Sequence, residues 1–108
     1  MNDEAQIEQM IQDKELNAPR VTPKDLDDAM TAALDIQYHH FPDTTVVVCC
    51  VVLANGFSLV GKAAAVSMEN FDMDVGKDVA YKDAREQLWT LLRYQLREQL
   101  VPRESITS

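Results

Sequence analysis

The chain has 108 residues and a mass of 12.2 kDa, and 46% of its residues are hydrophobic, which fits one folded domain over residues 1–108. Its formal net charge of −8 argues against general nucleic-acid binding, which needs cations to displace counterions. No apolar run reaches the ~20 residues that cross a bilayer, and the acidic N-terminus is unlike a signal peptide, so we expect a cytoplasmic protein without membrane contact.

The acidity belongs to the first part of the chain. Residues 1–43 carry ten acids and three bases, whereas residues 44–108 carry eight acids and seven bases. An anionic small molecule can therefore find a locally positive site in the second part.

The N-terminal region predicts a short amphipathic helix, because Ile7, Met10 and Ile11 recur at helical spacing. The sequence leaves open whether residues 1–20 are fixed to the domain or flexible. It also leaves open the order and the role of residues 1–37.

A second helix is predicted to begin at Thr22-Pro23-Lys24-Asp25, which supplies a hydroxyl N-cap, a proline at the first helical position and an acid in the first turn. Its apolar face predicts that it continues to about Ile36. Residues 38–43 are then predicted to form a loop.

An antiparallel β-hairpin is predicted over residues 44–66. Two apolar runs flank Asn55-Gly56, which is the preferred pair for a two-residue type I′ turn. Such a turn places Ala54 opposite Phe57. The small residues of the second strand, Gly61 and Ala63, leave room for a helix to approach closely.

Both faces of this hairpin are largely apolar, and a two-stranded hairpin alone is not stable. One chain of this length offers too few elements to cover both faces and both edges. We therefore expect a homo-oligomer, formed by pairing hairpins into a larger sheet or by packing long helices together.

A long helix is predicted over residues 73–100 from the spacing of its leucines and valines, with Gly76 delaying or kinking its start. Lys82, Arg93 and Arg97 fall on one stripe of this helix, beside Trp89. Arginine forks and an aromatic ring suit phosphates and a base. A solvated flank for the cations and core packing for Trp89 are the alternatives, and the sequence does not decide whether the cations contact ligand or solvent.

Catalytic and metal-binding motifs are absent from the sequence. It contains no phosphate-binding loop, no nucleotide-binding glycine fingerprint and no nucleophile–base pattern. Cys49-Cys50 and His39-His40 lack the spacing of a zinc site. We therefore expect no enzyme, no metal and no cofactor.

The ordered set Asn55-Gly56-Phe57, Asn70-Phe71-Asp72 and Trp89 resembles the small phage protein family named after gene products forty-nine of phage N4 and sixty-six of phage Sf6. The resemblance covers residues 40–100, and the further matching residues are Thr45, Gly61, Gly76, Ala84, Leu91, Tyr94 and Leu96. The chain departs from the family pattern at Ser67-Met68 and at Thr90, Leu92 and Arg93.

The resemblance implies an anti-defence protein of a phage or prophage, acting in the cytoplasm of the bacterial host. The family is similar to the Thoeris anti-defence sponge, which sequesters cyclic ADP-ribose signals, and to hexameric binders that trap the cyclic oligonucleotides of CBASS defence. These proteins bind without cleaving, in pockets between subunits, so the resemblance implies a homo-oligomer built from dimers and as large as a hexamer. The ligand-binding residues expected from it and from the cationic stripe are Asn55, Phe57, Asn70, Phe71, Arg93 and Arg97.

A second hypothesis comes from another class of protein. The charge of residues 1–43 also suits a phage accessory module whose acidic N-terminal helices bind a host protein. The sequence identifies neither the cyclic nucleotide nor the number of subunits.

Overall fold

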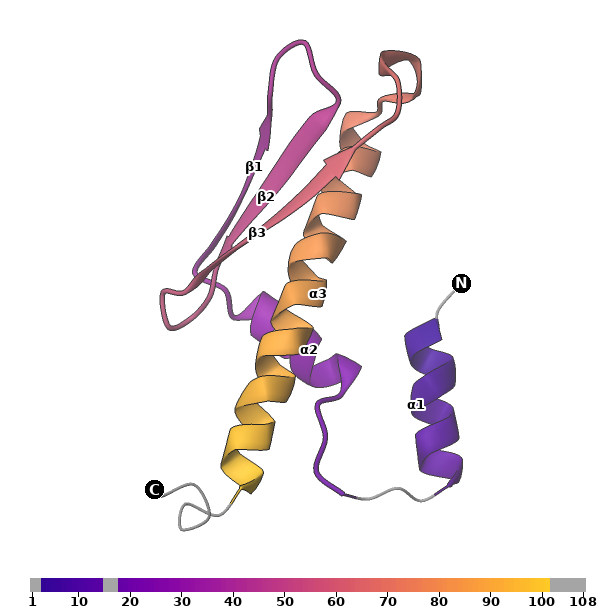
Figure 1. Cartoon of the computed structure of the whole chain (residues 1–108), viewed down its shortest axis with the longest axis vertical. Helices are drawn as coiled ribbons and strands as arrows, with labels where there is room; N and C mark the ends of the chain where they lie inside the picture. The colour runs from indigo at the N-terminus through magenta and orange to yellow at the C-terminus, as the bar shows by residue number, and fades with distance from the viewer. Residues whose placement is uncertain (1–2, 15–17, 102–108) are drawn as a thin grey trace.

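The computed structural model describes residues 3–14 and 18–101, and it confirms the predicted α+β fold. The elements follow the order α1 (Asp3–Asp13), α2 (Pro23–Thr31), β1 (Asp35–His40), β2 (Val46–Val52), β3 (Ser58–Ala64), η1 (Met68–Asn70) and α3 (Met73–Leu100). The three strands form one antiparallel sheet in the order β1-β2-β3, and α3 crosses one face of it (Figure 1). No helix in the described ranges is long and apolar enough to span a membrane.

Both N-terminal helices form where the sequence predicted them. The Thr22 hydroxyl accepts a hydrogen bond from the Asp25 backbone N–H at 3.1 Å, and the Asp25 carboxylate accepts one from the Thr22 N–H at 3.0 Å. This reciprocal pair satisfies two backbone donors that the helix itself leaves free. The spacing of apolar residues predicts the first helix over residues 3–16, and residues 15 and 16 lie outside the described residues.

The continuation of the second helix to Ile36 was wrong, and the loop predicted over residues 38–43 was wrong at residues 38–40. The helix ends at Thr31, and residues 35–40 form β1, paired with β2 from Asp35 opposite Val52 to His40 opposite Val47. Alternate residues Ile36, Tyr38 and His40 face the same side as the buried residues of β2. Pairing with a long apolar strand outweighs the weak local preference for helix.

The predicted turn and register of the hairpin were also wrong by one residue. Leu53 N–H donates to the Phe57 carbonyl at 2.8 Å, and Gly56 N–H donates to the Leu53 carbonyl at 2.8 Å. The loop therefore has three residues, with Gly56 alone at positive φ (+90°) and Asn55 in the ordinary region. Val52 pairs with Ser58 and not with Leu59. Because of this shift of one residue, the β3 side chains that were predicted on one side of the sheet lie on the other side relative to β2.

The corrected register collects the buried residues on one face. The core is formed by residues of β2, β3 and two helices. The strands contribute Val47, Cys49, Val51 and Leu59, and the helices contribute Leu26, Met30, Ala80, Ala84 and Leu88. Both cysteines are free thiols, with Cys49 buried and Cys50 on the opposite face of the strand.

Close approach of α3 to the sheet was predicted correctly, and glycines permit it. Gly61 lies against the α3 backbone at Ala80 and Ala84. Gly76 faces Val47, where a Cβ would stand 2.9 Å from the valine Cγ2. It does not delay the helix, which begins at Met73 after the N-cap Asp72.

Candidate functional site

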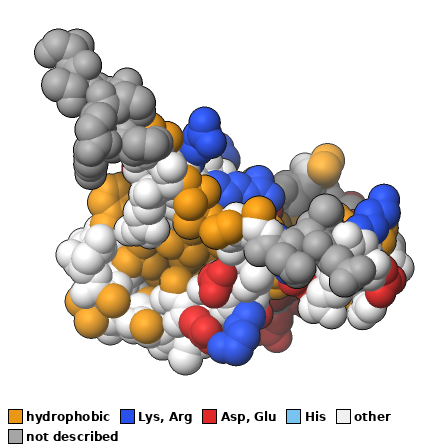
Figure 2. All heavy atoms as spheres, turned by 90° about the horizontal axis from the view of Figure 1, so that it is seen from below, with side chains coloured by type: hydrophobic (Ala, Val, Ile, Leu, Met, Phe, Trp, Pro, Cys, Tyr) orange, Lys and Arg blue, Asp and Glu red, His pale blue; other side chains and the backbone are white. Residues whose placement is uncertain are grey.

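A cavity of about 390 Å³ lies between α1, the segment before α2, and the C-terminal half of α3. This size falls within the range of small-molecule sites. Seen from below, hydrophobic side chains gather over the centre of this end of the molecule, with charged side chains around them (Figure 2). The apolar lining residues are Ile7, Ile11, Val21, Pro23, Trp89, Leu96 and Leu100.

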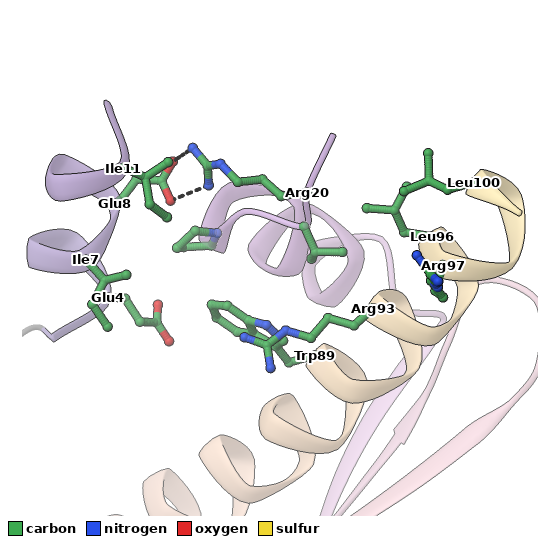
Figure 3. A pocket seen from close by; sticks show the side chains of 12 residues that line it. Glu4, Ile7, Glu8, Ile11, Arg20, Trp89, Arg93, Leu96, Arg97 and Leu100 are labelled. Atoms are coloured by element: carbon green, nitrogen blue, oxygen red, sulfur yellow. Dashed lines mark hydrogen bonds and ion pairs between the residues drawn. The ribbon is translucent and has the colours of Figure 1, made fainter. Parts of the chain in front are cut away.

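One face of α3 supplies the aromatic and basic part of the lining. Trp89, Arg93 and Arg97 follow one another at intervals of four residues, so their side chains leave the helix on the same side. The Arg93 guanidinium carbon lies 4.9 Å from the centroid of the Trp89 ring, in a cation–π contact (Figure 3). The buried Trp89 Nε1–H has no hydrogen-bond partner among the described residues.

Two arginines attach α1 at the opposite wall of the cavity. Arg20 makes a bidentate ion pair with Glu8, with Nη1 donating to Oε1 at 2.7 Å (Figure 3). Arg85 of α3 donates to both carboxylate oxygens of Glu4, at 2.6 and 3.0 Å. Arg85 also donates to Asp27 of α2 at 2.9 Å, so one side chain joins three helices.

These ion pairs lower the pKa values of the two carboxyl groups that line the cavity. Hydrogen bonding to Arg85 lowers the pKa of Glu4, although partial burial opposes the shift. Hydrogen bonding to Arg20 lowers the pKa of Glu8 in the same way. Both carboxylates are therefore ionised at neutral pH and already accept hydrogen bonds from an arginine, which makes them poor general bases.

The two remaining cations of the cavity have no such partner. Neither Arg93 nor Arg97 forms an ion pair with any carboxylate in the described part of the chain, whereas Lys82 pairs with Asp78 at 2.9 Å. Lys82 lies outside the cavity. Within the described part of the chain, the predicted stripe therefore divides into a lysine with an ion pair and two arginines without one, which line the cavity together with Trp89.

The other four predicted ligand-binding residues lie elsewhere in the chain. Asn55 and Phe57 occupy the β2–β3 turn beside Leu91 of α3, and the Asn55 side chain accepts a hydrogen bond from Phe57 N–H. Asn70 and Phe71 lie at the opposite end of the sheet. Within one chain, the six residues therefore occupy three separate places.

Phe71 already has an aromatic neighbour. The His40 ring stacks on it with centroids 4.7 Å apart and an interplanar angle of 21°. Among the described residues no group of three or more His, Cys, Asp or Glu side chains is placed to hold a metal ion.

Arg20 and Arg85 were not predicted as functional residues. Arg85 meets acids that are 81 and 58 positions away in the chain, so no local pattern could have identified it. Arg20 carries a weak signal, because it is an isolated cation in the acidic N-terminal region.

Comparison with known proteins identifies a family. The family model described as "Phage protein (N4 Gp49/phage Sf6 gene 66) family" matches residues 3–100. The match includes every helix and strand of the fold, and it extends the resemblance from residues 40–100 to the N-terminal helices. No curated protein and no solved structure matched the chain.

Proposed function

We propose that this chain, which belongs to the N4 Gp49/phage Sf6 gene 66 family of phage proteins, binds a cyclic nucleotide immune signal and releases it unchanged. Cyclic ADP-ribose isomers and the cyclic oligonucleotides of CBASS defence are the candidate ligands. In this proposal the protein is an anti-defence sponge and not an enzyme. The observation that carries the proposal is that Arg93 and Arg97, which line the cavity together with Trp89, form no ion pair with a carboxylate among the described residues.

The chemistry of the cavity supports an anionic ligand with an aromatic ring. Guanidinium groups of Arg93 and Arg97 pair well with phosphates because they present several donors in a fixed plane. The indole of Trp89 lines the same cavity, with the Arg93 guanidinium over its ring, and offers aromatic area for stacking. A nucleotide satisfies these groups together, whereas a purely apolar ligand leaves the two cations without a counter-charge.

The same lining supports binding without cleavage. Among the residues that the structure describes, this lining contains no cysteine, serine, lysine or histidine, and its two carboxylates, those of Glu4 and Glu8, are held by arginines. Hydrolysis requires a base that can accept a proton near neutral pH. We propose that Asn55, Phe57, Asn70 and Phe71 add contacts from a neighbouring copy, as the family resemblance implies for pockets between subunits.

Trp89 makes this proposal directly testable, because it is the only tryptophan of the chain. The protein is titrated with cyclic ADP-ribose isomers, cyclic dinucleotides and cyclic trinucleotides while tryptophan emission and melting temperature are recorded. Binding in the cavity changes both signals, since a ligand also stabilises the folded state. Trp89→Phe serves as the control for emission that does not arise in the cavity.

The bound ligand is then released by heating and its mass is measured. Intact ligand supports the sponge. Linearised product would make the protein an enzyme and overturn the proposal. Absence of binding to every member of the panel would favour the second hypothesis, a protein-interaction module.

The second hypothesis is supported by the exposed acids of the first two helices. Asp3 and Asp13 of α1 and Asp25, Asp27 and Asp28 of α2 are all exposed. Deleting residues 1–20 would not separate the hypotheses, because α1 forms a wall of the proposed cavity. Changing Asp25 and Asp28 to asparagine separates the two hypotheses, because these residues do not line the cavity and their loss should weaken only the binding of a host protein.

A further inference from the structure

We propose that β1 is the strand through which two copies of this chain pair, antiparallel and edge to edge, in a continuous six-stranded sheet. The axis of this pairing passes beside Tyr38, which lies opposite Tyr38 of the second copy. This inference concerns the assembly alone and does not depend on the identity of a ligand.

The two edges of the sheet differ in how their backbone groups are used. The backbone N–H of Leu53 donates to the Phe57 carbonyl. In this register the backbone groups of odd-numbered β3 residues therefore bond to β2, and the backbone groups of even-numbered β3 residues point to the free edge of the sheet. Side chains of α3 cover two of these groups. Asp83 accepts from Lys62 N–H at 2.9 Å, and the Gln87 side-chain amide donates to the Val60 carbonyl at 2.7 Å.

The β1 edge has no such cover. Phe41 N–H donates to the Val46 carbonyl, so in β1 the odd-numbered residues face β2 and the backbone groups of Ile36, Tyr38 and His40 face outward. Among the described residues, none bonds to these outward backbone groups. In Figure 1, β1 forms the outer edge of the sheet, on the side away from β3.

The sequence of β1 has few of the features that normally prevent edge pairing, since its one acidic residue, Asp35, stands at the first position of the strand. Residues 35–40 contain no lysine and no proline. In β3, by contrast, Lys62 is exposed and stands at the edge that α3 already covers. The fold therefore protects one edge and leaves the other able to bond.

A second copy of β1 fits this edge because its outward groups are symmetric about Tyr38. Antiparallel pairing with Tyr38 opposite itself places Ile36 opposite His40 of the second copy, and the reverse, so all three outward residues bond. On the other side of the sheet, Gln37 lies opposite His39 of the second copy. No residue pair in this register brings two carboxylates or two lysines together.

A charge exchange at the symmetry axis tests this register. Tyr38→Lys and Tyr38→Glu each place like charges opposite one another, so sedimentation should show each variant alone dissociated into chains of 12.2 kDa at tens of micromolar. An equimolar mixture places lysine opposite glutamate and should restore the paired mass. Gln95→Lys, an exposed change on α3 away from β1, is the matched control and should leave the assembly intact.

Hydrogen exchange on the unmodified chain gives a second test that does not depend on a variant folding. The amides of Ile36, Tyr38 and His40 should exchange at least tenfold more slowly in the assembly than after dilution to the monomer. Slow exchange limited to Gln37 and His39, which bond to β2 in either state, would overturn the proposal. An unmodified chain that sediments as a monomer, or a Tyr38→Lys variant that stays assembled, would overturn it as well.

Discussion

Gly61 of β3 lies directly against the backbone of Ala80 in α3. A Cβ atom built on Gly61 would stand 2.1 Å from the Ala80 carbonyl oxygen and 2.5 Å from the Ala84 nitrogen. Neither atom belongs to a side chain that could rotate away. The distance between sheet and helix is therefore set by the absence of a side chain at one position, and the placement of the rest of α3, including the cavity residues, depends on it.

The first prediction concerns this contact. Gly61→Ala should lower the free energy of unfolding by at least about 1–3 kcal/mol, the cost of inserting atoms into a packed core, because α3 must move away from β3. Chemical denaturation monitored by circular dichroism measures the loss. Ser58→Ala, an exposed change on the same strand, should stay within about 0.5 kcal/mol. An unchanged stability for Gly61→Ala would show that the helix is not this close.

The second prediction concerns Arg93 and Arg97, the arginines of the cavity that form no ion pair among the described residues. Arg97→Ala should weaken binding of a cyclic nucleotide by about 1.5–3 kcal/mol, the range for a hydrogen bond to a charged group. Isothermal titration measures the change. Lys82→Ala is the matched control, because Lys82 is a cation of the same helix that pairs with Asp78 outside the cavity. Equal losses for the two variants would indicate a general charge effect and contradict a specific contact.

The third prediction concerns the attachment of α1. Arg85→Met removes the ion pairs with Glu4 and Asp27 while keeping much of the apolar stem, so α1 should detach from α3 more often. We expect the free energy that holds α1 against α3 to fall by about 1 kcal/mol, which is the upper end of the range for partly exposed ion pairs. Amide exchange throughout α1 should become faster. Lys24→Met, which removes an exposed pair with Asp28, should leave the exchange of α1 unchanged.

The fourth prediction follows from the lowered pKa values of Glu4 and Glu8. A carboxyl whose pKa is lower in the folded state stabilises that state above its unfolded pKa, near 4.5, and loses this contribution as pH falls through the folded value. The attachment of α1 should therefore be complete at neutral pH and weaken below about pH 4.5. Amide exchange of α1 against pH measures it. In Glu4→Gln combined with Glu8→Gln, this pH dependence should disappear.

Much of the fold was predictable because its signals are local. The capping residues at Thr22 and Asp25 fix the start of α2, and the apolar spacing over residues 73–100 predicts α3 with the bounds that the structure gives. The Asn55-Gly56 pair correctly located a hairpin. These features depend on neighbouring residues, whose backbone preferences and hydrogen bonds do not require the rest of the chain.

The sequence by itself also determined the residues of the arginine–tryptophan face, since positions 89, 93 and 97 share one side of any α-helix. Only the tertiary structure decided what faces them. Arg85 and Arg20 bring α1 to that side through contacts between distant residues, and the same contacts occupy Glu4 and Glu8. The third strand and the one-residue register shift were likewise decided by pairing with β2, because a strand lowers its free energy through partners that local sequence does not specify.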